Sequence, residues 1–108
     1  MKRTLVRYKT QPDKAQENVR LIEGVFRELK ATSPGGVRYL SLRLDDDTFV
    51  HFHAVDDGAQ PVSTLNTFKT FQRNIEDRCI EQPQALEAVI VGNYRMLDED
   101  ATPAGRSK

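Results

Sequence analysis

The chain has 108 residues, 38% of them hydrophobic, which suits one small domain with a modest core. Sixteen Lys and Arg balance sixteen Asp and Glu, so the zero net charge gives no electrostatic reason to expect nucleic acid. No apolar run is long enough to span a bilayer, and the first residues lack the apolar segment and the small-residue cleavage site that a secretory signal would have. The single cysteine cannot form an internal disulfide. We therefore expect a cytoplasmic protein that binds neither nucleic acid nor membrane.

The first two elements are predicted as a strand and a long helix. Residues 2–9 are rich in strand-forming side chains. Thr10 is a candidate helix cap, and Pro12 suits a first helical turn. Apolar side chains then recur at three- and four-residue spacing, which predicts an amphipathic helix. They are Ala15, Val19, Ile22, Val25, Phe26 and Leu29. The Thr-Ser-Pro-Gly-Gly segment at 32–36 ends this helix.

Two further strands, 37–44 and 48–55, are predicted to pair across the aspartates at 45–47. A three-residue loop places Leu42 opposite Val50, whereas a two-residue loop would pair Leu42 with His51 and mix the two faces. With the longer loop, one face, here called the leucine face, holds Leu40, Leu42, Leu44, Val50 and Phe52. The other, called the histidine face, holds Val37, Tyr39, Ser41, Arg43, Phe49, His51, His53 and Val55.

The remaining elements are a second helix and a last strand. The helix begins at Ser63 or Asn66, either of which is a good cap, and ends before Pro83. Its apolar stripe consists of Leu65, Phe68, Phe71, Ile75 and Cys79. Residues 88–92 predict a strand that continues to 95. The polar residues 98–108 predict a disordered tail, so the domain is expected at 1–97.

This order of elements predicts a ferredoxin-like α+β fold, βαββαβ, with a four-stranded antiparallel sheet and two helices on one face. We expect the leucine face to meet the two apolar helix stripes. The histidine face is then open, and its apolar area favours a homodimer that packs sheet to sheet. A monomer with a half-polar open face is the alternative.

The chain resembles the dimeric α+β barrel superfamily, and within it the antibiotic-biosynthesis-monooxygenase-like domains. The resemblance covers about residues 2–96. It rests on the Leu-Val-Arg-Tyr-Lys-Thr-x-Pro segment at 5–12, the long helix, the Thr-Phe-Val-His-Phe segment at 48–52, and Phe68-x-x-Phe71.

The resemblance implies a barrel of two paired sheets with a pocket between the sheet and the helices of each protomer. Some members oxidise quinols or polyketide aromatics with oxygen and no cofactor, and others degrade haem, isomerise lactones or have no known activity. The haem-degrading members use an Asn, Trp and His constellation. This sequence contains no tryptophan, which argues against haem degradation.

Both histidines of the chain lie in His51-Phe52-His53, where residues two apart share one face of a strand. Either could deprotonate a phenolic substrate, with Tyr39 or Ser41 orienting the imidazole and Arg43 holding the anion. The alternatives are polar contacts in a dimer interface, or a metal site that would still need a third ligand. We expect no metal site.

Further candidate substrate contacts are Arg7, Phe68 and Phe71. Arg7 would join the histidines on the open face if Val6 and Tyr8 face the helices. The two phenylalanines have an alternative role as core residues, and Cys79 is expected to be a buried apolar residue rather than a nucleophile.

Two functions remain open from the sequence. One is a cofactor-independent monooxygenase that acts on a small aromatic of quinol or polyketide type, with no cofactor expected. The other is a non-catalytic dimeric module that binds a small molecule or a partner.

Overall fold

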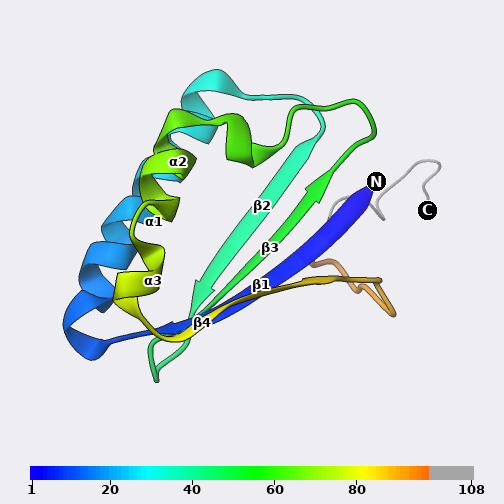
Figure 1. The fold of residues 1–108 in the computed structure, drawn as a ribbon. Helices are drawn as coiled ribbons and strands as arrows, with labels where there is room; N and C mark the ends of the chain where they lie inside the picture. Colours follow the sequence, from blue (N-terminus) through cyan, green and yellow to red (C-terminus); the bar gives the residue numbers. More distant parts are fainter. Residues whose placement is uncertain (98–108) are drawn as a thin grey trace.

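The computed structural model describes residues 1–97, and the predicted tail at 98–108 lies outside them. The four strands form one antiparallel sheet in the order β2-β3-β1-β4, with three helices on one of its faces (Figure 1). The strands are β1 (Lys2–Thr10), β2 (Val37–Arg43), β3 (Thr48–Val55) and β4 (Cys79–Glu87). The helices are α1 (Ala15–Thr32), α2 (Asn66–Gln72) and α3 (Ile75–Arg78), with 3-10 turns at Pro12–Lys14 and Val62–Thr64. The expected ferredoxin-like α+β fold is confirmed.

The hairpin of β2 and β3 has the predicted register. Leu42 lies opposite Val50 and Leu40 opposite Phe52, with a three-residue turn at 45–47. The turn closes through the Leu44 amide, which donates to the Thr48 carbonyl at 2.8 Å. Asp47 adopts the left-handed conformation with φ 65°, which short acidic side chains tolerate better than most.

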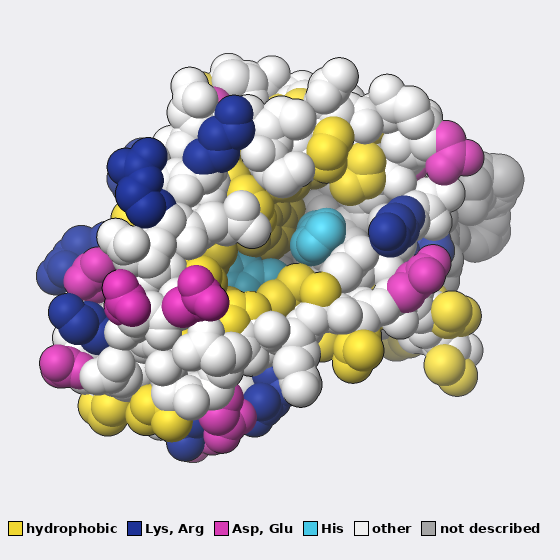
Figure 2. Space-filling view, in the orientation of Figure 1, with side chains coloured by type: hydrophobic (Ala, Val, Ile, Leu, Met, Phe, Trp, Pro, Cys, Tyr) yellow, Lys and Arg dark blue, Asp and Glu magenta, His cyan; other side chains and the backbone are white. Residues whose placement is uncertain are grey.

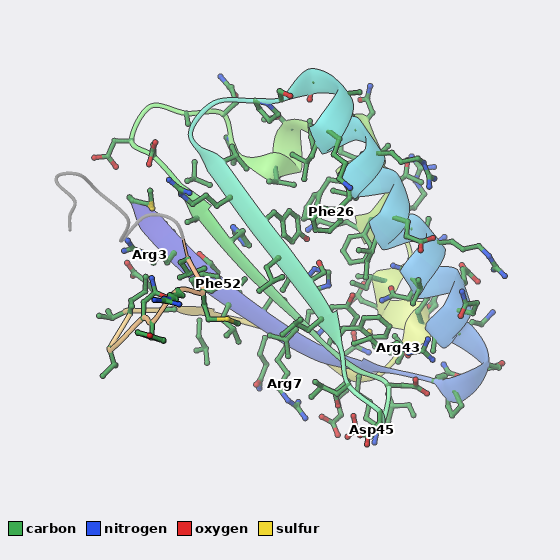
Figure 3. All side chains as sticks on the ribbon, turned by 180° about the vertical axis from the view of Figure 1, so that it is seen from behind. Arg3, Arg7, Phe26, Arg43, Asp45 and Phe52 are labelled. Atoms are coloured by element: carbon green, nitrogen blue, oxygen red, sulfur yellow. The ribbon has the colours of Figure 1, made fainter. Side chains whose placement is uncertain are left out.

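The prediction of which sheet face meets the helices was wrong. The histidine face packs under the helices, where Phe49 and His51 are almost fully buried. The leucine face is open, and Leu40 and Leu42 are 43% and 48% exposed. Figure 3 shows Phe52 on this side, away from the helices. Both faces carry enough apolar side chains to cover a helix, so hydrophobicity alone does not distinguish them.

Helix α1 follows its predicted apolar stripe, with Ala15, Ile22 and Val25 buried against the sheet. Its C-terminus is capped by Ser33 in the left-handed conformation, whose amide donates to the Leu29 carbonyl at 2.8 Å. The expectation that Thr10 caps the helix was wrong. Thr10 is the last residue of β1, and its buried hydroxyl has no hydrogen-bond partner among the described residues.

The predicted end of the second helix and the predicted last strand were both wrong. Helix α2 begins at Asn66, one of the two expected starts, but ends at Gln72, and Asn74 follows in the left-handed conformation with φ 61°. The last strand begins already at Cys79, because β1 has a second edge whose backbone groups need partners. That pairing outweighs the stronger strand propensity of residues 88–92.

Strand β4 lies at the edge of the sheet and tolerates a proline. Between the pairs Arg7–Gln84 and Lys9–Glu81, β4 has one more residue than β1, which is a β-bulge. Pro83 lies in this bulge, where its missing N–H costs no ladder hydrogen bond. The bulge also brings Pro83 over the helix-covered face, where it lines the cavity described below.

Residues 88–97 leave the sheet after the Ala88 amide donates to the Arg3 carbonyl at 2.9 Å. They form no strand, and Val91 and Tyr94 are strongly exposed. The Asn93 side chain closes a local turn by accepting hydrogen bonds from the amides of Met96 and Leu97. Within residues 1–97, no helix combines the length and the hydropathy of a membrane span.

The entry to β2 depends on a glycine, which gives a first prediction. Gly36 has φ 77°, and a Cβ built there would lie 2.9 Å from the Ala59 Cβ. We expect Gly36→Ala to lower the free energy of unfolding by about 1–3 kcal/mol, read from urea denaturation. The matched control is Gly35→Ala, whose Cβ meets nothing within 4 Å. Equal losses in the two variants would contradict the prediction.

Candidate functional site

A cavity of about 300 Å³ lies between the histidine face of the sheet and helices α2 and α3. Figure 2 shows it as a hollow with histidine side chains inside a mostly hydrophobic surround. The sheet contributes Val6, Tyr8, Tyr39, His51, His53 and Pro83, and the helical segment contributes Phe68, Phe71, Gln72 and Ile75. None of these described lining residues is a Lys, Arg, Asp or Glu. The cavity is therefore aromatic and uncharged.

The position of α2, which carries one wall of this cavity, is fixed from α1. The Glu28 carboxylate of α1 accepts hydrogen bonds from the Thr67 amide at 3.1 Å and from the Thr67 hydroxyl at 2.5 Å. These bonds lower the pKa of Glu28. A carboxylate at a helix N-terminus satisfies an amide that has no partner within the helix.

His51 lies at the centre of the sheet and is held at both ring nitrogens. Its Nε2 is 2.8 Å from the Tyr8 hydroxyl, and its Nδ1 is 2.9 Å from the Tyr39 hydroxyl and 2.7 Å from the Ser41 hydroxyl. Burial, together with the neighbouring His53, lowers the pKa of His51 to about 4. His51 is therefore a neutral imidazole at pH 7, with both nitrogens engaged by the protein.

Behind Tyr8 the hydrogen bonds continue to α1 and to the end of α3. Asn18 Nδ2 donates to the Tyr8 hydroxyl at 2.8 Å, and Arg78 Nε donates to Asn18 Oδ1 at 3.1 Å. Burial raises the pKa of Tyr8 far above its ordinary value of 10.0, so the phenol keeps its proton. Tyr8, Asn18, Arg78 and His51 are each less than a tenth exposed.

His53 differs from His51 in that no residue of the described chain makes a hydrogen bond with its ring. It is about half-buried, and burial is the main cause of its lowered pKa, with Lys2 contributing. Its ring contacts Tyr39, with the centroids 5.8 Å apart. His53 therefore presents an unengaged, neutral imidazole to the cavity.

Tyr39 and Ser41 lie on β2 and reach His51 from the other side. Burial raises the pKa of Tyr39 to about 12, so this phenol also keeps its proton at neutral pH. Its ring packs on Phe26 of α1, which Figure 3 shows between that helix and the sheet. Tyr39 lines the cavity, whereas Ser41 does not line it and is hydrogen-bonded to His51, which does.

The two arginines considered as substrate contacts do not line the cavity. Arg43 belongs to the histidine face, but it forms an ion pair with Asp47 at 2.8 Å and lies over the Phe49 ring. Arg7 lies on the leucine face, as expected if Val6 and Tyr8 face the helices, but the histidines are not there with it (Figure 3). It pairs with Glu81 at 2.8 Å. The cavity therefore lacks the cation that we expected to hold an anion.

Phe68 and Phe71 both line the cavity, with their ring centroids 5.7 Å apart. Phe71 is also part of the buried core, so the two roles considered for it are compatible. Cys79 is buried in that core from the first position of β4, and not from a helix, and burial raises the pKa of its thiol. No three side chains within residues 1–97 are grouped as metal ligands.

The sequence reasoning missed Tyr8, Asn18 and Arg78 as parts of this site. One signal was present: Asn18 interrupts the apolar stripe of α1 at helical spacing between Ala15 and Ile22. A polar residue on an otherwise apolar helix face implies a buried hydrogen-bond partner. Arg78 had no such signal, since its burial depends on the unpredicted turn between α2 and α3.

The buried histidine predicts a loss of stability in acid. The unfolded chain protonates this imidazole below about pH 6.5, and the folded chain only below about pH 4. The contribution of the neutral His51 to the free energy of unfolding is thus complete above pH 6.5 and is lost as the pH falls from 6.5 toward 4. In His53→Gln, where His51 is the only histidine, we expect the unfolding free energy to fall by about 2 kcal/mol between pH 7 and pH 5. Urea denaturation at the two pH values measures this difference, and an equal unfolding free energy at both would contradict the prediction.

Comparisons with known proteins identify the fold and not the activity. No family model matches the chain, and no curated protein matches its sequence. Solved structures do match. One from Nitrosomonas europaea, provisionally named an antibiotic biosynthesis monooxygenase, has a TM-score of 0.68 at 15% identity and covers 85% of this chain and 100% of its own.

Two further structures show the same likeness. A protein with the same provisional name from Bacteroides thetaiotaomicron has a TM-score of 0.70 at 13% identity, covering 83% of this chain and 89% of its own. A conserved protein from Methanosarcina mazei has a TM-score of 0.66 at 14% identity, covering 81% of this chain and 89% of its own. The chain therefore shares its ferredoxin-like fold with structures that carry the name antibiotic biosynthesis monooxygenase.

Proposed function

We propose that the protein is a cofactor-independent monooxygenase that binds a small, neutral aromatic compound in the cavity under helices α2 and α3. The observation that carries this proposal is the unengaged imidazole of His53 in an aromatic cavity with no charged lining residue. Phe68, Phe71 and Tyr39 provide rings for stacking. The names of the structural neighbours support the same class of activity.

His53 is the better candidate for the base. Both nitrogens of His51 already have protein partners, and its pKa near 4 makes it a weak proton acceptor. His53 has no competing partner in the described chain and is neutral at pH 7, so it can accept the proton of a phenol. In this division of roles His51 orders Tyr39 and Ser41 and does not exchange a proton with the substrate.

The proposed reaction uses molecular oxygen as the oxidant. His53 removes a proton from the substrate, and the resulting electron-rich anion gives its electrons to oxygen. For an anthrone-type substrate, the ring CH₂ group becomes a carbonyl: one oxygen atom forms the carbonyl and the other leaves as water with the two hydrogens. The aromatic walls exclude bulk water, and the Tyr39 hydroxyl in the cavity wall is a group that can hold the anion.

A non-catalytic binding module is the second candidate. We expected such a module to bury the histidines in a dimer interface, whereas the structure places both beneath the helices and beside a cavity. The fully bonded His51 is compatible with either function, and only the unengaged His53 favours chemistry. Both candidates require the same aromatic cavity.

The homodimer belongs to the same proposal, now through the leucine face. The exposed side chains of this face include Leu40, Leu42 and Leu44 on β2 and its turn, and Leu86 on β4. An apolar sheet surface of this kind is unfavourable in water, and the face of a second copy would cover it by two-fold symmetry. We also expect a cytoplasmic location, supported by the unpaired Cys79.

The activity is tested by oxygen uptake with anthrone or a naphthoquinol as the substrate. We expect His53→Gln to lower kcat by about 10²- to 10⁴-fold with little change in KM, because a general base acts on the step and not on binding. Arg20→Gln on the exposed surface of α1 is the control and should keep full activity. An unchanged kcat in His53→Gln would exclude the proposed base.

The assembly is tested by sedimentation equilibrium. We expect the unaltered chain to sediment as a dimer and Leu42→Glu to sediment as a monomer, because a carboxylate in an apolar interface has no partner. Gln16→Glu places the same charge on the exposed side of α1 and should leave the dimer intact. A monomeric unaltered chain at high concentration would contradict the assembly.

A further inference from the structure

A continuous series of hydrogen bonds crosses the core from Arg78 to the cavity wall. It passes from Arg78 to Asn18, from Asn18 to Tyr8, from Tyr8 to His51, and from His51 to Tyr39 and Ser41. The first four residues are nearly inaccessible to water, so their polar atoms depend on each other. Since each donor needs an acceptor, the direction of the bonds can be followed from one end.

The direction is fixed at Arg78, because a guanidinium can only donate. Its two terminal nitrogens donate to the Arg73 and Phe71 carbonyls at 3.0 and 2.6 Å, and Nε donates to Asn18. The oxygen of the Asn18 amide must therefore face Arg78, and its NH₂ group must face Tyr8. The flipped amide would bring two donors together and leave Tyr8 without its own donor.

The same logic determines the proton on His51. The Tyr8 oxygen already accepts a hydrogen bond from Asn18, and the only remaining partner for the Tyr8 proton in the described chain is His51 Nε2. Nε2 is then an acceptor without a proton. Since no carboxylate contacts His51 and the ring is buried, the imidazole is neutral and carries its single proton on Nδ1.

The opposite tautomer is disfavoured by the same contacts. A proton on Nε2 would be donated to Tyr8, which would then accept two hydrogen bonds while its own proton had no acceptor. Tyr8 is 0% exposed, so water cannot take that proton.

The proton on Nδ1 affects the residue that lines the cavity. Nδ1 donates toward the oxygens of Tyr39 and Ser41, so neither hydroxyl gives its proton to His51. We propose that Asn18 and Arg78 are positioning residues that hold His51 in its Nδ1–H tautomer and so leave the Tyr39 hydroxyl free to donate to an oxygen atom of the ligand. Neither residue touches the cavity, and both act through Tyr8 and His51.

This inference requires no assumption about the reaction, because the tautomer is a property of the free protein. A ligand with a carbonyl or phenolic oxygen would meet a donor at Tyr39 in either candidate function. The monooxygenase proposal can therefore fail while the tautomer assignment holds, and the tautomer assignment can fail while the monooxygenase proposal holds.

Asn18→Asp tests the assignment with almost no change of shape. The introduced carboxylate accepts from Arg78 Nε but cannot donate to Tyr8. Tyr8 then donates its proton to the carboxylate, and His51 can bond to Tyr8 only by donating from Nε2. We expect the tautomer to switch from Nδ1–H in the unaltered chain to Nε2–H in the variant. The ion pair with buried Arg78 favours a folded variant, since no acidic residue among 1–97 pairs with that guanidinium.

The measurement is ¹⁵N NMR of the imidazole nitrogens in the full, unliganded chain at pH 7.5. The chain has only two histidines, and His53→Gln assigns their signals. Asn66→Asp makes the same chemical change at the exposed start of α2 and should leave the His51 tautomer unchanged. Tyr8→Phe keeps the ring in the core and removes the donor to Nε2, so it should also produce the Nε2–H form.

An Nε2 proton in the unaltered chain would overturn the proposal. So would an unchanged Nδ1–H form in Asn18→Asp. If that variant does not fold, the Tyr8→Phe spectrum decides in the same way, because a tautomer that survives the loss of the Tyr8 hydroxyl is not held by this series of bonds.

Discussion

The hydrogen bond between Tyr8 and His51 is the constraint on which the arrangement of this protein depends. The two residues lie on the central strands β1 and β3, and both are buried beneath the helices. An imidazole can be buried at low cost only when both nitrogens have partners. Tyr8 satisfies one nitrogen, and Tyr39 and Ser41 satisfy the other. Asn18 then brings α1 into the same network.

This network explains how a sheet face with two histidines serves as the covered face. Its aromatic members stack closely, with Tyr8 5.5 Å from Phe49 and 5.3 Å from His51 between ring centroids. The face therefore combines apolar area with satisfied polar atoms. The short α2 and α3 leave space above His53, and this space is the cavity. The same choice of face leaves the leucine side chains outside, which is the physical basis for the proposed dimer.

The parts of the fold that were predicted correctly depend on local patterns. The helix stripe of α1 and the register of the β2–β3 hairpin follow from residue spacing and from one short turn. Tyr39, His51 and His53 were also singled out from the sequence, as residue types that can move or hold protons. The sequence did not reveal that His51 is bonded at both nitrogens while His53 is not. That difference depends on Tyr8, which is 43 residues away in the chain.

The parts that were predicted wrongly depend on long-range competition. Residues 88–92 have the better strand composition, yet residues 79–87 occupy the edge of β1. The leucine face has the more uniform apolar pattern, yet the helices cover the other face. The sequence by itself determined the class of fold, the first helix and the hairpin register, because these follow from periodicity and turn length. Only the tertiary structure decided which face is covered and which histidine is free, because both depend on hydrogen-bond partners that distant strands and helices bring together.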